Sequence, residues 1–569
     1  MLAKPLELSD SIRPAARRGL LLASGGVGVL ALAAALTIAL AGSHSGQSGS
    51  PAFPGHVRFL GRVPATQQID LTIVLRLRDS AGASRAESAI NDPNSPQFHH
   101  FLSPGAFGAR YGLPVSVLGR IERALARRGL RVTASYPQRT ALALAGSAGS
   151  VESLLQVSIG NYGDGAHRWR APLTKPALPP WLAKVASSVA GLDTRSAWQP
   201  RDVPLGGLTP SEAGIAYDLA PLHAQGYLGQ HSTIAIVSFS DYSPTDAAKY
   251  DQRFGIKGPP PGVIRVDGGT TDDSGADETN LDINVIRAVA PLARILVYVA
   301  PQSSTSYTDT INKIVADRAA QVVSSSWGQC ELGIYRFESA GDTQAIRVAD
   351  AAGISIFAAS GDSGAYDCES AQLTDRRLSV DWPAASAGVI AVGGTRLYLN
   401  QDGTYLREAG WEYALSGAGG GGGLAQGDAR PSWQTGPGVS NAYSNGHRQL
   451  PDVSADADPA TGWTAYSTAN GEFAEIGGTS AATPFWAAST LLVSEYARAR
   501  GVGKLGFVDP TLYALAATPQ PFPAFHDVLA GGNRYYQATP GWDYATGLGS
   551  PDVYNLARDT TAYLQAHRR

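Results

Sequence analysis

Hydrophobic and polar positions divide the chain into two parts with different patterns. From about residue 210, short apolar runs of strand length alternate with amphipathic stretches of helix length. Near-continuous Val, Ile and Ala favour strands that are covered on both faces. The pattern therefore predicts an α/β domain over residues 211–569 with a mostly parallel sheet flanked by helices. The predicted strands are 233–239, 294–300, 320–327, 353–360 and 388–394, and the predicted helices are about 276–290, 308–318 and 340–352.

The preceding residues, 56–195, have the mixed pattern of a small α+β domain. Alternation predicts a strand at 69–79 and a pair of strands within 131–148, and helical periodicity predicts helices at 115–130 and 150–159. This part contains no candidate catalytic cluster. Residues 196–210 are rich in Pro and Arg without periodicity, which predicts an exposed linker open to proteolytic processing.

The first 42 residues have the composition of an export signal. Four basic residues precede an uncharged apolar run over 19–41 that ends in Ala-Leu-Ala, which suits signal peptidase. Because the run is long enough to span a bilayer, an uncleaved membrane anchor is the alternative. Residues 43–55 form a polar linker rich in Gly, Ser and Pro. We therefore expect a secreted protein whose contact with a membrane, if any, is through this N-terminal segment.

Charge is distributed unevenly along the chain. The first 200 residues hold 21 Lys and Arg against 10 Asp and Glu, whereas the remainder holds 24 against 38. One interpretation is two solvated surfaces of opposite sign; the other is that the basic front domain docks on the acidic remainder. Under the second interpretation, acid would protonate carboxylates and weaken the docking.

The chain has two cysteines, Cys330 and Cys368. In an exported protein a lone pair favours a disulfide over a metal site, which would need more ligands, or a catalytic thiol, which would need a nearby histidine.

Ser480, in 476-IGGTSAATPFWAA-488, is a candidate nucleophile at the start of a predicted helix, but a serine hydroxyl needs a base to take its proton. No histidine lies in surroundings that suggest a triad. Glu278 and Asp282 share one face of the predicted helix 276–290, although such a pair alone is usually a solvated stripe. Asp362, in 359-ASGDSGAYDC-368, would on its own be a turn residue.

The combination of these four residues, in the order Glu, Asp, Asp, Ser, resembles the sedolisins, the serine-carboxyl peptidases, and among them the bacterial kumamolisin-like members. The segment 95-SPQFHHFLSPGAFGARYG-112 is similar to the activation propeptide of that family, and 540-PGWDYATGLGSP-551 to its C-terminal region. The resemblance implies a subtilisin-like peptidase domain preceded by a ferredoxin-like propeptide that inhibits it within the same chain.

The resemblance also implies a role for each residue. Ser480 matches the nucleophile, Glu278 the general base, and Asp282 the acid that orients Glu278. Asp362 matches the residue that completes the oxyanion hole, which requires a protonated carboxyl and hence acid. Cys330 and Cys368 would lie at the active-site edge of the sheet, where a bridge would brace the loop carrying Asp362.

One bound Ca²⁺ per chain is the implied cofactor. Asp527 and Asp543 match the carboxylate ligands, and the backbone oxygens of Val528, Thr539 and Gly541 match the others; an oxygen-only shell suits this ion. On composition alone, Asp527 and Asp543 would be interpreted as two ordinary loop aspartates.

Two features depart from the family pattern. Ser238 stands where kumamolisin-like members have a glutamate that reaches the catalytic acid through a tryptophan, which Trp327 matches. The run 417-GAGGGGG-423 aligns with a Gly-rich segment that borders the substrate cleft in relatives. Its extra glycines favour a flexible linker, and a backbone edge that pairs with an extended peptide is the alternative for part of it.

The sequence as a whole predicts a secreted, acid-acting serine endopeptidase made as a self-processing, monomeric zymogen. Its partners would be protein and peptide substrates, without nucleic acid. Alternatives are tripeptidyl-peptidase activity, a histidine-dependent subtilisin-type peptidase, and a peptide-binding relative without catalysis.

Overall fold

The computed structural model describes residues 57–163, 168–195, 203–204, 207–334, 336–371, 375–413, 415–468 and 473–567. The predicted signal or anchor over 1–42, the 43–55 linker and most of the 196–210 linker lie outside the described residues. Within the described residues, no helix is both long enough and apolar enough to cross a membrane.

The larger domain is built on an eight-stranded sheet, and each of the five predicted apolar runs contributes a strand to it. Its neighbouring strands are parallel, except that β17 pairs with β16 in the antiparallel direction at one edge, while β22 pairs parallel to β16. The predicted α/β architecture is therefore confirmed. The strands in spatial order are β10 (Gly262–Arg265), β11 (Arg294–Val299), β9 (Thr233–Ser238), β12 (Val322–Ser325), β14 (Ser355–Ala359), β16 (Ile390–Leu399) and β17 (Tyr405–Gly410), with β22 (Val453–Asp456) beside β16.

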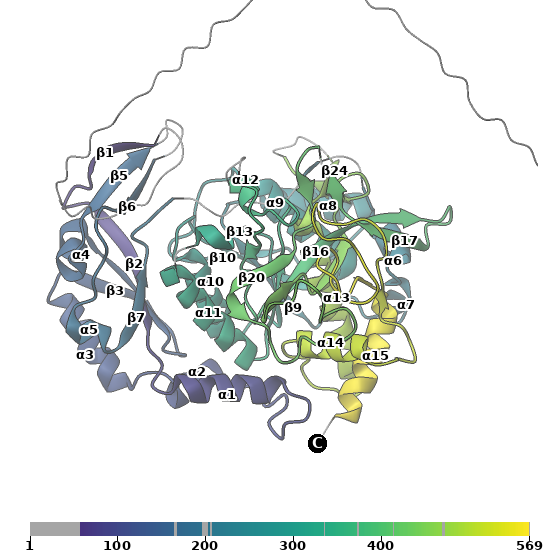
Figure 1. The fold of residues 1–569 in the computed structure, drawn as a ribbon, viewed down its shortest axis with the longest axis horizontal. Coiled ribbons are helices and arrows are strands. Elements are labelled where there is room, and N and C mark those ends of the chain that lie inside the picture. Colours follow the sequence, from purple (N-terminus) through teal and green to yellow (C-terminus); the bar gives the residue numbers. More distant parts are fainter. Residues whose placement is uncertain are drawn as a thin grey trace, which may run out of the picture. The chain divides into compact units, whose positions relative to one another are not determined.

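Helices cover both faces of this sheet, as Figure 1 shows. Along β9, Ile234 and Ile236 belong to one apolar core with helices α9 (Ala276–Val289), α13 (Thr479–Ala499) and α15 (Val553–Ala566). Ala235 and Val237 belong to the opposite core with α10 (Ser306–Asp317) and α11 (Arg336–Ala351). Consecutive side chains of a strand point to opposite faces of the sheet. Because helices cover both faces here, the side chains on each face must be apolar. Further elements are α6 (Pro210–Ala216), α7 (Ala220–Ala224), α8 (Pro244–Phe254), α12 (Cys368–Ala371), α14 (Asp509–Ala517), β13 (Gln329–Cys330), β15 (Asp381–Trp382), β18 (Glu412–Tyr413), β19 (Ala418–Gly419), β20 (Gly423–Ala429), β21 (His447–Leu450), β23 (Trp463–Tyr466), β24 (Phe473–Gly477), β25 (Phe525–His526) and β26 (Ser550–Pro551).

The N-terminal domain has its own apolar core, which includes Leu71, Ile73, Leu125 and Leu154. Its main sheet is antiparallel in the order β3-β4-β2-β7, and a second sheet has the order β1-β5-β6. The predicted α+β class is confirmed. Its elements are β1 (Arg58–Arg62), β2 (Gln68–Leu75), α1 (Ser80–Asn91), α2 (Pro104–Arg110), α3 (Val115–Ala126), β3 (Leu130–Ser135), β4 (Ala141–Ser147), α4 (Ala148–Leu155), β5 (Ile159–Gly163), β6 (Arg168–Pro172), α5 (Pro180–Ala183) and β7 (Ala186–Ala190).

The two domains meet through apolar packing and hydrogen bonds. Ala83, Phe107 and Tyr111 of the N-terminal domain belong to the apolar core that includes α10 and α11. The hydroxyl of Thr72 on β2 donates to Asp309 Oδ2 on α10 at 2.6 Å. Gln344 Nε2 on α11 donates to the carbonyls of Leu75 and Thr140 at 3.0 and 2.9 Å. One ion pair, Arg347 to Glu87 at 2.6 Å, also crosses this interface.

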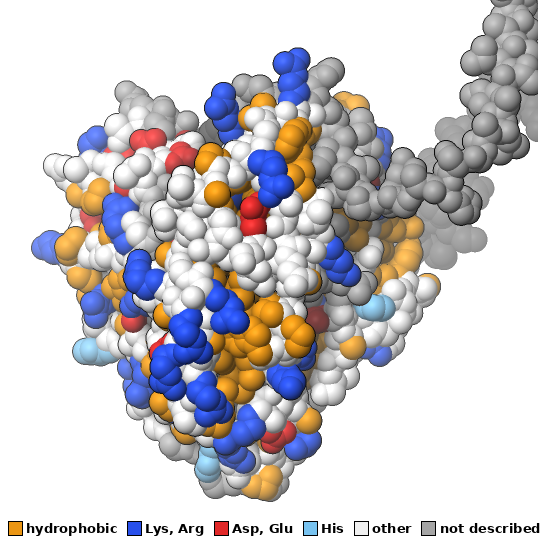
Figure 2. All heavy atoms as spheres, turned by 90° about the vertical axis from the view of Figure 1, so that its left-hand side faces the viewer, with side chains coloured by type: hydrophobic (Ala, Val, Ile, Leu, Met, Phe, Trp, Pro, Cys, Tyr) orange, Lys and Arg blue, Asp and Glu red, His pale blue; other side chains and the backbone are white. Residues whose placement is uncertain are grey.

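Basic side chains of the N-terminal domain gather on its outward face, which Figure 2 shows. On α3 and the adjoining strand they include the exposed Arg120, Arg123, Arg127 and Arg131. The interpretation that this charge docks the domain on the acidic remainder is therefore wrong for these residues, which face solvent instead.

Candidate active site

Ser480 lies in the first turn of α13, directly after the β24 strand. Gly478, which precedes the helix, has φ +102°, a conformation that side-chain-bearing residues rarely adopt. The Ser480 side chain is fully buried, and its Oγ lies 3.4 Å from the main-chain oxygen of Ser326 at the end of β12. The predicted position at a helix start is confirmed, and the hydroxyl faces the carboxyl edge of the sheet.

The two acids predicted to share a helix face lie on α9, which packs along α13. Glu278 and Asp282 are both fully buried, so a solvated stripe is the wrong interpretation. The hydroxyl of Ser326 donates to Asp282 Oδ1 at 2.7 Å. Ser326 thus contacts Asp282 with its side chain and the Ser480 hydroxyl with its carbonyl. Apart from the position of Ser326 at a strand end, no sequence pattern indicates this role.

The start of α9 is fixed by its neighbours. A Cβ on Gly275 would lie 2.4 Å from the Trp327 ring, so the indole packs directly on the residue before the helix. Ser238, at the departure from the family pattern, exchanges a hydrogen bond with the Thr279 hydroxyl at 2.7 Å. The indole Nε1 of Trp327 has no hydrogen-bond partner among the described residues. Ser238 therefore contacts the first turn of α9 and not the indole.

Asp362 lies against the first residue of α13. Its Oδ1 accepts two hydrogen bonds of 2.8 Å from Thr479, one from the main-chain N–H and one from the hydroxyl. Thr479 is the neighbour of Ser480, so the structure brings the carboxyl of Asp362 and the candidate nucleophile together.

The glycine run 417–423 packs against the loop that carries Asp362. Gly419 N donates to the Asp362 carbonyl at 2.9 Å, and Gly421 N donates to the Gly361 carbonyl at 2.7 Å. A Cβ on Gly421 would lie 1.8 Å from the Ser360 oxygen. The prediction of a flexible linker is therefore wrong: these glycines are buried and permit one backbone to approach another closely.

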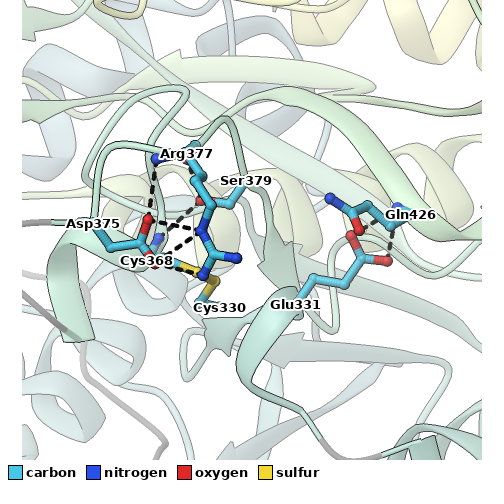
Figure 3. Close-up of a disulfide and its surroundings, with 7 residues drawn as sticks. All are labelled: Cys330, Glu331, Cys368, Asp375, Arg377, Ser379 and Gln426. Carbon is cyan, nitrogen blue, oxygen red and sulfur yellow. Dashed lines mark hydrogen bonds and ion pairs between the residues drawn. A yellow bond between two sulfur atoms is a disulfide. The ribbon is translucent and has the colours of Figure 1, made fainter. Parts of the chain in front are cut away.

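A disulfide also holds the same loop. The predicted disulfide is confirmed: Cys330 and Cys368 are bonded, with a Cα–Cα distance of 5.0 Å. Figure 3 shows the bridge, with Ser379 Oγ accepting a 3.0 Å hydrogen bond from the Cys368 N–H. In the same figure, the neighbouring Glu331 accepts main-chain hydrogen bonds from Gln426. The bridge thus joins the end of β13 to the chain that follows Asp362.

Arg534 is a bracing residue that the sequence analysis missed. Its Nη1 donates to the carbonyls of Ser363 and Gly417 at 2.9 and 2.7 Å, and its Nη2 pairs with Glu369 at 2.7 Å. Its backbone has φ +75°. A non-glycine residue in that region is uncommon, and no sequence pattern would have indicated it.

Two of the histidines in the described residues, His223 and His526, contact groups other than Ser480. His223 Nε2 lies 2.8 Å from the Val289 carbonyl, and burial lowers its pKa. His526 stacks on Tyr405, and burial lowers its pKa to about 4. The hydroxyl of Ser480 faces a main-chain oxygen rather than an imidazole.

The five residues predicted to bind calcium lie together in the loops after α14. Asp527 Oδ2 accepts a hydrogen bond from Gly541 N at 3.0 Å, and Asp543 Oδ2 accepts one from Thr539 N at 2.9 Å. Burial raises the pKa of both carboxyls, that of Asp543 to about 6. The described residues contain no group of three or more acidic, His or Cys side chains that could hold a metal ion, so main-chain oxygens such as that of Val528 would supply the other ligands. Two desolvated carboxylates that both contact residues 539–541 fit a hard cation.

Comparisons with known proteins agree with this arrangement. Residues 55–195 match the family model described as pro-kumamolisin, activation domain, and residues 268–502 match the subtilase family. The chain is 33% identical to kumamolisin of Bacillus sp. (strain MN-32), over 86% of this chain and 91% of that protein. It is 26% identical to tripeptidyl-peptidase 1 of Bos taurus, over 89% of this chain and 93% of that protein.

Sedolisin of Pseudomonas sp. (strain 101) is 30% identical over 88% of each chain. A solved structure of Pseudomonas sedolisin, a serine-carboxyl proteinase in complex with pseudo-iodotyrostatin, matches with a TM-score of 0.55 and 29% identity, covering 64% of this chain and 99% of that one. The sequence similarity spans both the N-terminal and the peptidase domain. The chain belongs to the sedolisin family of serine-carboxyl peptidases and carries the pro-kumamolisin activation domain of that family.

Proposed function

We propose that this protein is a secreted, acid-acting endopeptidase that is made as a self-processing zymogen. The observation that carries the proposal is the chemistry around Ser480. Carboxyl groups approach it from two sides. Asp362 accepts a hydrogen bond from Thr479, the neighbour of Ser480. Asp282 accepts one from the Ser326 hydroxyl, and the Ser326 carbonyl faces the Ser480 hydroxyl. Acidic side chains in place of imidazole suit a pH at which histidine would be protonated.

In the proposed acylation step, Ser480 Oγ attacks the scissile carbonyl carbon and its proton moves to the Glu278 carboxylate. Collapse of the tetrahedral intermediate breaks the C–N bond, and the proton passes from Glu278 to the leaving amine. Water then hydrolyses the acyl-enzyme by the same route. Asp282 orients Glu278. To accept the Ser480 proton, Glu278 must be ionised when the reaction starts.

Asp362 would stabilise the oxyanion by donating a hydrogen bond. Its Oδ1 is already held as an acceptor by two donors of Thr479, which leaves Oδ2 as the oxygen that carries the proton. The reaction therefore needs Asp362 protonated while Glu278 is ionised, and these two conditions predict a bell-shaped pH profile on the acid side.

Calcium would bind Asp527 and Asp543 with the carbonyls of Val528, Thr539 and Gly541. Both carboxyls contact one turn through the Gly541 and Thr539 amides. When bound, the ion would supply positive charge and fix loop geometry; it would take no part in bond breaking.

Hydrolysis of an unstructured protein across pH 2–8 tests the proposal, with wild type, Glu278→Gln and Ser480→Ala compared. We expect a wild-type maximum below pH 5 and losses in both variants of at least about 1,000-fold. A maximum near neutrality, or a Glu278→Gln enzyme with full activity, would refute it. Product masses from a long peptide separate internal cleavage from tripeptide release, which the similarity to tripeptidyl-peptidase 1 makes the second candidate.

A further inference from the structure

A cavity of about 500 Å³ lies at the seam between the N-terminal domain and the peptidase domain. One wall is the C-terminal end of α1 with the turn that follows it, and the other is built from α11, α14, α15 and the loop after β20. Because both domains supply walls, the cavity exists only while they are docked. Its lining includes Glu87, Asn91, Asp350, Trp433, Phe507 and Tyr563.

Two buried oxygen atoms in these walls lack a hydrogen-bond donor. Asp350 is 1% exposed, and its Oδ1 has no hydrogen-bond partner among the described residues. Its other oxygen, Oδ2, lies against Gly388, where an added Cβ would be 2.5 Å away, so Oδ1 is the oxygen left for the cavity. On the α1 wall, Asn91 Oδ1 is likewise buried without a partner in the described part of the chain. Because buried acceptors are almost always paired, both oxygens indicate a ligand that donates hydrogen bonds.

The charge around the cavity is negative. Burial, followed by the neighbouring Glu87 carboxyl, raises the pKa of Asp350 well above its usual range. Asp428 places a further carboxyl near Glu87. Arg347 faces both Asp350 and Glu87, but its Nε is already paired with Glu87 at 2.6 Å. A positively charged donor is therefore favoured over a neutral one.

The other lining residues select an organic cation rather than a metal ion. Within the described part of the chain, no set of three acidic, His or Cys side chains could hold a metal ion. Trp433, Phe507 and Tyr563 bring aromatic rings to the cavity, and those of Trp433 and Phe507 meet edge to face at 5.7 Å. Aromatic faces attract ammonium and guanidinium groups, and they also cover the apolar part of such a molecule.

We propose that the seam cavity binds a small organic cation, a protonated amine or guanidine with an apolar body. Its N–H groups donate to Asp350 and Asn91, and its body lies on the aromatic rings. Because the ligand binds only the docked form, it stabilises the docking of the N-terminal domain. The proposal concerns the uncleaved chain and does not depend on catalysis.

The test uses the full chain carrying Ser480→Ala, so that no cleavage intervenes. The probe is benzylammonium, and benzyl alcohol is its neutral counterpart of nearly the same shape. Isothermal titration calorimetry at pH 7 measures binding, and hydrogen exchange of the α1 amides is followed with and without the probe. Asp350→Asn removes the carboxylate and keeps its shape. Asp402→Asn, on an exposed turn outside the cavity, is the control that changes the net charge equally.

We expect benzylammonium to bind with a Kd on the order of 1 mM or tighter, and at least about tenfold more tightly than benzyl alcohol. At a concentration about ten times the Kd, exchange of the α1 amides through opening should slow about tenfold. Asp350→Asn should weaken binding at least about tenfold, whereas Asp402→Asn should keep the affinity of the parent chain. Asn91→Ala should also weaken binding, which keeps the test decisive if Asp350→Asn does not dock.

Four results would each overturn the proposal. They are equal binding of the alcohol and the ammonium, an affinity that neither cavity variant changes, binding that leaves α1 exchange unaltered, and no measurable binding of benzylammonium up to about 10 mM.

Discussion

The hydrogen bond between Thr72 and Asp309 leads to a quantitative prediction about propeptide docking. Both side chains are 1% exposed, and the Thr72 hydroxyl donates to Asp309 Oδ2 at 2.6 Å. Burial, followed by the neighbouring Asp267 carboxyl, raises the pKa of Asp309 well above its usual range. The docked propeptide thus encloses a carboxyl that prefers to be protonated.

Thr72→Val removes the donor and keeps the shape of the side chain. A buried polar group that loses its partner costs about 1–3 kcal/mol, because the partner lost in the protein is not replaced by water. The docked state should weaken by that amount relative to the opened state, so the opened fraction should rise about 5- to 150-fold.

Hydrogen exchange of the full chain measures this opening. All proteins carry Ser480→Ala so that self-cleavage does not intervene, and the amides of β2 and α10 are followed. Thr133→Val is the matched control, because Thr133 is exposed on the propeptide strand β3. The reasoning is refuted if β2 exchange in Thr72→Val stays within twofold of the control.

The same interface predicts how docking depends on pH. Burial raises the pKa of Glu87, beside Arg347, and of Asp350, which faces Glu87. Together with Asp309, these acids hold protons more tightly when docked than when solvated. Docking therefore takes up protons: it is strongest below the usual carboxyl range and weakens as pH rises through the raised pKa values.

This sign opposes the expectation that acid loosens the propeptide. Under the proposed mechanism, acid would activate the zymogen by protonating Asp362, so that cleavage begins while the propeptide is still docked. Opening rates, corrected for intrinsic exchange, should be lower at pH 4 than at pH 7. Opening that is faster at pH 4 than at pH 7 would contradict this prediction. It would support the expectation that acid releases the propeptide by neutralising charge.

Three further predictions concern the peptidase domain. Replacing both Cys330 and Cys368 by Ser removes a bridge between residues 38 apart; the chain-entropy estimate is about 4 kcal/mol, or roughly 5 °C in the Tm of a domain of this size, and a shift under 1 °C in calorimetry would contradict it. Gly421→Ala places a Cβ against the Ser360 oxygen and should lower kcat at least about 100-fold, whereas Gly214→Ala, with open space around it, should leave kcat unchanged. Chelation of calcium should lower the Tm, with recovery on adding Ca²⁺ but not Mg²⁺; a Tm indifferent to chelator would remove the ion from the proposal.

The parts of the fold that follow from local pattern could be predicted from sequence. The strands of the central sheet were evident because side chains on both faces are apolar, as Ile234 and Val237 show. Strand β7 was missed because Ala186–Ala190 is rich in Ala and Ser, without the alternation of large apolar residues that marks a strand. It becomes a strand through pairing with β2, which is a tertiary contact.

The four chemical groups of the candidate site could be predicted from the sequence. The residues that position them could not. Glu278, Asp282, Asp362 and Ser480 stand in recognisable segments. Ser326 does not, because its significance comes from lying between Asp282 and Ser480 in space. Arg534 and the glycine run likewise act on a loop far away in sequence, and composition alone made that run look like a linker.

The contacts around Asp362 explain why so many distant segments converge on one short loop. A protonated carboxyl stabilises an oxyanion only if its position is fixed before charge develops, since reorganisation during the reaction would consume the benefit. An enzyme that works in acid has a second constraint, because carboxylate ion pairs weaken as their acids are protonated. The loop is held chiefly by a disulfide and by main-chain hydrogen bonds from Gly419 and Gly421, none of which titrates in the carboxyl range. The ion pair between Arg534 and Glu369 is supported by two hydrogen bonds from Arg534 to carbonyls, and these two bonds do not depend on an acid. The bracing is therefore suited to keep its geometry at the pH where Asp362 would be protonated.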